Sequence, residues 1–393
     1  MSQLPRRAYR LDHLPPYGFA VLGQRIQDMT AVGKDVIRLD IGSPDLPPSE
    51  AVIEAFKRSA SNPHHYQYGS YRGDPAFREA VAAYYKRRFG VELDPFHEIL
   101  PLIGSKEGLV NLAVAYIDRG DAAIVPSIAY PAYMMGTIMA GGSVIDMPLD
   151  PDNGYLPDFD AIKGDLSHAK LLWINYPNNP TGAVADLAFY ERAAAFCREH
   201  NLLLCSDNPY CEIVFDGYQA PSALQAAGAK DCTVEFMSVS KTYNLAGVRL
   251  GACVGNAEAI HNLLNVKSNI DSGHWKAIYD AATYAINNTS QSWIDERNLR
   301  YQARRRRILD TLPHIGLEAF ESPATLYVWA RVPDGDDESY ARAALEEAEV
   351  ALTPGTIYGI AGAGYVRISL TMPEERLDAA LARLRDWYRV RVA

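Results

Sequence analysis

Short, almost wholly apolar runs alternate with helical patterns through the middle of the chain. The segments Leu171–Asn175, Leu202–Ser206 and Val234–Val239 have the length and composition of buried strands. Between the first two, Leu187–Glu199 has the apolar spacing of an amphipathic helix. Buried strands separated by helices are typical of a parallel sheet with helices on both faces. The pattern therefore predicts an α/β fold whose ligands bind at the carboxyl ends of the strands.

The C-terminal third follows a different pattern, in which strands and helices no longer alternate regularly. It is predicted to contain a long charged helix, two strands and a final helix, namely Ser292–Leu312, Thr325–Val332, Tyr365–Leu370 and Glu374–Arg389. A chain of 393 residues is also long for a single core, which favours two domains. We assign residues 48–285 to a large domain, and residues 1–47 together with 286–393 to a smaller α+β domain.

Composition and charge exclude several classes of function. The formal net charge of −10 offers no basic surface for nucleic acid. The five cysteines lack the spacing of a zinc site or of a disulfide framework, so we expect no metal. The N-terminal segment has no signal-peptide core, and no apolar run approaches the roughly 18 residues of a membrane helix. We therefore expect a cytoplasmic protein that binds neither membranes nor nucleic acid.

The most informative segment is SVSKTYNLAGVRLG, which runs from Ser238 to Gly251. Lys241 follows a predicted buried strand, and burial disfavours the charged ammonium, so its amine is available for imine formation. Arg249 lies eight residues further on and can return to the same site to clamp a phosphate. The segment thus combines a reactive amine with a phosphate-binding group.

Three further segments place polar residues beside predicted strands or helices. The sequence NYPNNPTGA, from Asn175 to Ala183, makes a rigid polar turn after a strand. In CSDNPY, Asp207 stands at the end of a very apolar strand, where an unpaired carboxylate would be costly. In LIGSKEGL, a glycine and Ser105 precede a helical pattern, and the backbone amides at a helix start bind phosphate well.

Together these segments resemble the class I/II aminotransferases, a fold-type-I family that uses pyridoxal 5′-phosphate (PLP). The resemblance covers nearly the whole chain. It implies a large domain with a mostly parallel, seven-stranded type of sheet and a smaller α+β domain. It also implies a homodimer with shared active sites that moves an amino group between an amino acid and a 2-oxo acid such as 2-oxoglutarate.

The resemblance implies a role for each matching residue. Lys241 forms the Schiff base and moves the substrate proton, Asp207 pairs with the protonated pyridine nitrogen, and Tyr130 stacks on the ring. The other implied cofactor contacts are Ser105, Lys106, Glu107, Asn179, Tyr210, Ser238, Arg249 and, from the neighbouring subunit, Tyr68. The implied substrate contacts are Arg367, Asn179, Gly42, Tyr17, Lys106 and, again from the partner, Asn269.

Within the family the chain is most similar to the LL-diaminopimelate aminotransferase group, which implies a donor such as LL-diaminopimelate or another amino acid with a distal polar group. Three positions depart from that group. Tyr71 stands where some members carry a glutamate, His274 begins an unusual HWKAIYD run, and Val248 precedes Arg249. We expect these departures on the substrate side of the site.

Two alternatives stay open on the sequence. One is a PLP enzyme that does not transaminate, such as a β-lyase, a cyclase or an amino-acid oxidase of a specialised biosynthetic pathway. The other is a PLP-sensing transcription regulator, which the acidic charge and the lack of a helix-turn-helix pattern disfavour.

Overall fold

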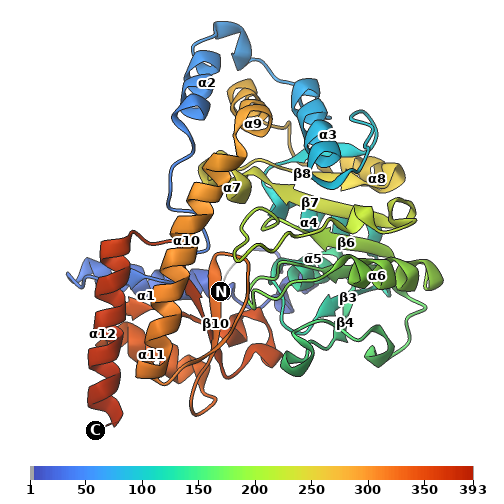
Figure 1. Ribbon diagram of the computed structural model, residues 1–393. Coiled ribbons are helices and arrows are strands. Elements are labelled where there is room, and N and C mark those ends of the chain that lie inside the picture. The colour runs from blue at the N-terminus through green and yellow to red at the C-terminus, as the bar shows by residue number, and fades with distance from the viewer. Residues whose placement is uncertain (1–3, 393) are drawn as a thin grey trace.

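The structure is a computed structural model that describes residues 4–392 (Figure 1). Its larger part is built on a seven-stranded sheet with the strand order β2-β8-β7-β6-β5-β3-β4. Six strands are parallel to one another, and β8 runs antiparallel to both of its neighbours. The strands are β2 (Ile99–Leu102), β3 (Ala122–Pro126), β4 (Ser143–Met147), β5 (Ala169–Ile174), β6 (Leu203–Asp207), β7 (Thr233–Ser238) and β8 (Gly251–Gly255).

The three strands predicted from apolar runs are β5, β6 and β7, so the predicted parallel layer is confirmed. The helix predicted between β5 and β6 is also confirmed, with the bounds Leu187–Glu199 (α6). Its start is fixed by Asp186, whose side chain accepts a hydrogen bond of 2.8 Å from the backbone N–H of Phe189. Its buried stripe includes Phe189, Tyr190 and Cys197, which is the apolar face that the spacing predicted.

Helices cover both faces of this sheet because successive strand residues point to opposite sides. Leu172 and Ile174 of β5 belong to one core with α6, whereas Leu171 and Trp173 belong to another core on the opposite face. That second core contains α4 (Ser105–Tyr116), α5 (Ala132–Ala140) and α8 (Ala257–Lys267). A third core packs α3 (Pro75–Phe89) and α9 (Lys276–Asn288) beside β2 and β8, next to α2 (Glu50–Ala60) (Figure 1).

The smaller part is α+β, as predicted. An antiparallel sheet has the order β12-β13-β10-β9, formed by β12 (Thr353–Pro354), β13 (Tyr365–Ser369), β10 (Tyr327–Arg331) and β9 (Glu318–Phe320). The N-terminal segment joins this part, because β1 (Ile37–Arg38) pairs in parallel with β11 (Val350–Ala351). Its helices are α1 (Gly18–Ala31), α10 (Gln291–Thr311), α11 (Asp337–Glu347) and α12 (Glu374–Val392).

The long helix α10 runs from the upper part of the molecule down beside the small sheet (Figure 1). The division of the chain at residues 48 and 286 stays a prediction. Short 3-10 turns complete the chain, at Tyr9–Asp12, Pro63–Tyr66, Pro151–Asn153, Phe159–Ala161, Ala223–Gln225, Ala229–Asp231, Ala246–Val248, Leu312–Ile315, Gly355–Tyr358 and Ile360–Gly362. Within residues 4–392, no helix combines the length and apolarity needed to cross a membrane.

The carboxyl ends of β5, β6 and β7 meet the N-terminal segment and the small sheet. Asn175, Asp207 and Ser238 stand at these three strand ends, and the short helix α7 (Val239–Thr242) follows β7 directly. Parallel α/β sheets bind their ligands at this edge. The fold therefore brings the polar residues singled out in the sequence to one place.

Candidate active site

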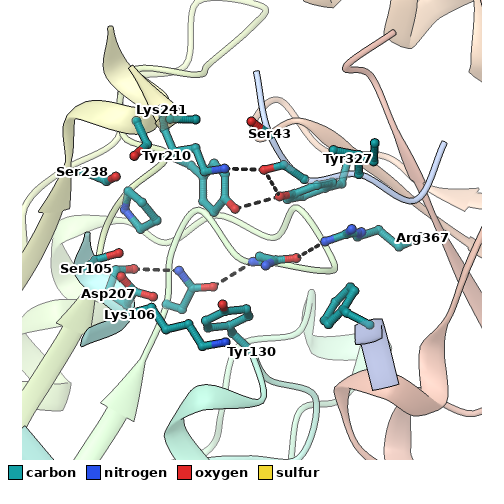
Figure 2. A pocket seen from close by; sticks show the side chains of 18 of the residues that line it. Ser43, Ser105, Lys106, Tyr130, Asp207, Tyr210, Ser238, Lys241, Tyr327 and Arg367 are labelled. Atoms are coloured by element: carbon teal, nitrogen blue, oxygen red, sulfur yellow. Dashed lines mark hydrogen bonds between the residues drawn. The ribbon is translucent and has the colours of Figure 1, made fainter. Parts of the chain in front are cut away.

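A cavity of about 410 Å³ lies at this edge of the sheet. It brings together the predicted site residues Tyr17, Gly42, Ser105, Lys106, Tyr130, Asn179, Asp207, Tyr210, Ser238, Lys241, Arg249 and Arg367. In Figure 2, Lys241 and Tyr210 lie on one side of the cavity, Arg367 lies across from them, and Lys106 and Tyr130 lie below. The predicted residues Glu107, Tyr68 and Asn269 do not line it.

Lys241 projects into the cavity from α7. Its Nζ donates a hydrogen bond to the carbonyl oxygen of Gly42 and lies 5.7 Å from the centre of the Tyr210 ring. Burial lowers the pKa of Lys241 to about 7, helped by the positive charges of Arg367 and Arg249 and opposed by Asp207. Near neutral pH a large share of this amine is therefore uncharged, and an uncharged amine can act as a nucleophile or a base.

Asp207 ends β6 with only one of its carboxylate oxygens satisfied. The hydroxyl of Tyr133 donates to Oδ2 at 2.7 Å, and Oδ1 has no hydrogen-bond partner among the described residues. Burial raises the pKa of Asp207 to about 7, although the Tyr133 hydrogen bond opposes this shift. An unsatisfied carboxylate oxygen facing a cavity suits a ligand with a protonated ring nitrogen, and PLP is such a ligand.

One end of the cavity suits a phosphate. Ser105 begins α4, where the first backbone amides of the helix have no intrahelical partner. Ser238 and Arg249 line the same cavity, and Gly104 adopts φ 72° directly beneath the Arg249 guanidinium. A side chain at Gly104 would displace that guanidinium, and the positive φ is a conformation that glycine adopts without strain. These donors fit the phosphate of PLP.

The other end of the cavity suits a carboxylate. Arg367, on β13, is buried, and its two Nη groups donate to the side-chain oxygen of Asn179 (3.0 Å) and the carbonyl oxygen of Asp40 (2.6 Å). Both acceptors are neutral, and Arg367 Nε has no partner within residues 4–392. The ring of Tyr327 lies 4.1 Å from the guanidinium. A buried cation with unused donors is a binding site for an anion.

Gly42 and Lys106 complete the walls. A side chain at Gly42 would bring a Cβ to 2.5 Å from the hydroxyl of Tyr327, so only glycine lets this segment pass. Tyr327 in turn shares a hydrogen bond of 2.8 Å with the hydroxyl of Tyr210. The Nζ of Lys106 lies 4.1 Å from the centre of the Tyr17 ring and 5.7 Å from that of Tyr130.

Three predicted site residues lie elsewhere. Glu107 accepts a hydrogen bond of 3.0 Å from the backbone N–H of Ile103 and lies 3.5 Å from Lys267, so it supports the start of α4 from outside the cavity. Tyr68 is 90% exposed. Asn269 is exposed as well and donates to the carbonyl oxygen of Asn265 at 2.8 Å. A role for Tyr68 or Asn269 therefore requires a second chain.

The prediction that His274 lies on the substrate side of the site is wrong. His274 lies behind the phosphate end of the cavity, with Nε2 2.6 Å from the carbonyl oxygen of Arg249. A carbonyl oxygen can only accept, so Nε2 donates this hydrogen bond, and burial lowers the pKa of the His274 ring. The bond supports Arg249, which adopts the left-handed φ of 56°. Tyr71 is 56% exposed and does not line the cavity.

Sequence reasoning missed four residues that contact the site. Tyr133 follows Tyr130 by three positions in YPAY, so the repeated tyrosine at the start of a helix was the available signal. Tyr327 lies in an apolar strand pattern that gave no indication of a role. Arg38 and Asp40 alternate with apolar residues in VIRLDIG, and such alternation in a strand puts both on one face.

Comparison with known proteins agrees with this geometry. A sequence model described as aminotransferase class I and II matches residues 34–384. The LL-diaminopimelate aminotransferase of Dehalococcoides mccartyi strain 195 is 47% identical over 96% of this chain and 98% of its own. That of Desulforudis audaxviator is 48% identical, over 96% and 97%. The substrate-bound structure of BacF from Bacillus subtilis matches with a TM-score of 0.92 at 35% identity, over 98% of both chains.

Proposed function

Because the chain belongs to the class I and II aminotransferase family, whose members are PLP-dependent transaminases, we propose that its transamination runs on Lys241 with LL-diaminopimelate as amino donor. The observation that carries the proposal is one cavity that holds an amine with a lowered pKa, a carboxylate oxygen without a partner, and a buried guanidinium with unused donors. The acceptor is a 2-oxo acid, for which we propose 2-oxoglutarate.

The residues present fit PLP. Asp207 would face the ring nitrogen, with Tyr133 holding the other carboxylate oxygen, and Tyr130 would stack on the ring. Asn179 and Tyr210 would contact the ring hydroxyl. The phosphate would be held by Ser105, Ser238, Arg249 and the backbone N–H of Lys106 in the first turn of α4. When bound, PLP supplies a cationic ring that accepts the electron pair released at the substrate α-carbon.

The chain's own groups then bind the substrate and move its proton. Arg367 binds the α-carboxylate through two parallel N–H donors, which fixes the orientation of the α-carbon. Lys241 Nζ removes the α-proton and returns it after the electron pair has shifted, a general acid-base role that suits a pKa of about 7. The acceptor acid binds to the same Arg367 in the second half of the cycle, so ping-pong kinetics follow.

The donor is inferred from the relatives and from the charge of the cavity. The relatives at 47% and 48% identity are named LL-diaminopimelate aminotransferases. Lys106, held against the ring of Tyr17, is a second cation suited to a distal carboxylate of the donor. The non-transaminating alternative is disfavoured, because the family is one of aminotransferases.

We infer that the working unit is a homodimer. Tyr66, Tyr68, Tyr71 and Ile270 are 66%, 90%, 56% and 61% exposed, which is unusual for large apolar side chains. Ile270 follows Asn269 directly in the sequence, and Tyr68 and Asn269 are the two residues that the family resemblance assigns to the neighbouring active site. A second copy of the chain would cover them and complete both cavities.

The five cysteines are all unpaired, which favours the reducing cytoplasm that we propose as the location.

A panel of amino donors tests the transamination. LL-diaminopimelate, L-glutamate, L-aspartate, L-alanine and L-phenylalanine are each added to the PLP-loaded protein without an acceptor. We expect LL-diaminopimelate to bleach the cofactor absorbance most efficiently, and 2-oxoglutarate to restore it. Release of ammonia without any restoration by a 2-oxo acid would favour a lyase or an oxidase instead.

Mixing inactive variants tests the shared site. Lys241→Ala and Tyr68→Ala chains are refolded together, so that each mixed dimer has one doubly altered cavity and one intact cavity. We expect activity to reappear in the mixture, as shared sites require. A mixture no more active than the sum of its two parents would contradict the shared site.

A further inference from the structure

A second arginine lies beside Arg367 and is occupied by a carboxylate of the same chain. Arg38, at the end of β1, lines the same cavity as Arg367. Its guanidinium donates to both oxygens of Asp40, from Nε to Oδ1 at 2.7 Å and from Nη2 to Oδ2 at 2.7 Å. The Arg38 side chain is 33% exposed, whereas that of Asp40 is 5% exposed. The pair is therefore bidentate and largely withdrawn from water.

Asp40 also connects the two arginines. Its backbone carbonyl oxygen accepts the hydrogen bond of 2.6 Å from Arg367 Nη2. The carboxylate belongs to the same residue, so it is separated from the Arg367 guanidinium by no more than the length of the Asp40 side chain. Burial lowers the pKa of Arg367, but nearby phenols and the Asp40 carboxylate raise it, with a net increase. The negative charge of Asp40 therefore already acts on Arg367.

Loss of Arg38 would leave Asp40 as a buried carboxylate without a partner. Such a group is costly and takes the nearest available cation. Arg367 is that cation, because its present acceptors, Asn179 Oδ1 and the Asp40 carbonyl, are neutral. A ligand carboxylate would then have to displace Asp40 before it could bind.

We propose that Arg38 is a positioning residue that holds the Asp40 carboxylate away from Arg367, so that the Arg367 guanidinium stays available to a substrate carboxylate. The inference rests on the proposed role of Arg367 in binding the substrate. It adds that the affinity of Arg367 for a carboxylate ligand depends on the neighbouring ion pair between Arg38 and Asp40.

Calorimetric titration of the PLP-loaded protein with 2-oxoglutarate measures this affinity without requiring turnover. We expect Arg38→Gln to weaken binding about tenfold, because Asp40 then competes for Arg367. Asp40→Asn removes the competitor and should not weaken binding. The double variant Arg38→Gln/Asp40→Asn should recover most of the wild-type affinity, although it lacks the whole ion pair.

A control variant removes an arginine that also makes a bidentate contact with an aspartate, at a position outside the cavity. Arg376 makes two hydrogen bonds to Asp35, at 2.9 and 2.6 Å, and Arg376→Gln should leave the affinity for 2-oxoglutarate unchanged. Arg38→Lys keeps the charge but loses the bidentate geometry, so an effect of about two- to threefold is expected. This variant also carries the test if Arg38→Gln does not fold.

Two outcomes would overturn the proposal. One is wild-type affinity in Arg38→Gln. The other is equal weakening in Arg38→Gln, Asp40→Asn and the double variant, since that is what a purely structural pair would give. Failure of the proposed function gives a different result. The wild-type protein and the variants would then show the expected order of affinities for 2-oxoglutarate, but the wild-type protein would transaminate no donor.

Discussion

The substitution Tyr133→Phe isolates the hydrogen bond that holds Asp207. Phenylalanine keeps the ring, which stacks on Trp173 with centroids 5.0 Å apart and an interplanar angle of 8°. Only the hydroxyl that donates to Asp207 Oδ2 at 2.7 Å is lost. A hydrogen bond to a charged group contributes about 1.5–3 kcal/mol. The ionised form of Asp207 is therefore disfavoured, and its pKa rises above the present value of about 7.

The consequence for PLP follows from the sign of this shift. A ring cation pairs only with the ionised carboxylate, so in the wild-type protein the affinity of the apoprotein for PLP should rise with pH through about 7. In Tyr133→Phe the same rise should be shifted upward by about one pH unit, which corresponds to about 1.4 kcal/mol. The variant should therefore bind PLP about tenfold more weakly below about pH 7 and recover above about pH 9.

Titration of the apoprotein with PLP at a series of pH values, followed by absorbance, measures this effect. Tyr340→Phe is the matched control, because the Tyr340 hydroxyl donates to the carbonyl oxygen of Ile315 at 2.8 Å in the small domain, outside the cavity lining. The control should bind PLP as the wild type does. Equal affinity in Tyr133→Phe at every pH, or a deficit that grows as pH rises, would refute the reasoning.

Three further predictions concern the other walls of the cavity. Arg367→Lys loses the bidentate geometry, so steady-state kinetics should show kcat/KM reduced about a hundredfold, mainly through KM; an unchanged KM would argue against carboxylate binding. Gly42→Ala forces a methyl group against the Tyr327 hydroxyl 2.5 Å away, so a thermal melt should show a loss of about 1–3 kcal/mol, and wild-type stability would contradict the steric argument. Stopped-flow mixing of apoprotein with PLP should give a rate that rises up to about pH 7 and then levels off, because Lys241 reacts as the neutral amine; a rise continuing to about pH 10 would show an ordinary lysine.

Much of the fold could be predicted from the sequence because its signals are local. The runs that became β5, β6 and β7 are apolar on both faces, and Leu187–Glu199 carries both an apolar stripe and an N-cap at Asp186. The pairing of β1 with β11 could not be predicted, since two-residue strands about 310 positions apart leave no periodic signal.

Some residues of the candidate site could be predicted from local sequence patterns, and others could not. Lys241, Asp207 and Arg249 stand directly after or near strand ends, so strand prediction was enough to group them. The roles of Tyr133 and Asp40 depend on side-chain directions across separate elements, which one sequence does not encode locally. His274 was expected on the substrate side together with the other departures from the LL-diaminopimelate aminotransferase group, yet its ring bonds to the backbone of Arg249.

We propose that Lys241 is the residue that binds the cofactor and moves the substrate proton. Lys241 and Lys106 both line the cavity, and burial lowers the pKa of Lys241 to about 7. Borohydride reduction of the PLP-loaded protein makes the covalent bond between cofactor and lysine permanent, and peptide mapping by mass spectrometry then locates it. We expect the added pyridoxyl mass on the peptide that contains Lys241. Finding that mass on Lys106, or on no lysine, would contradict this proposal.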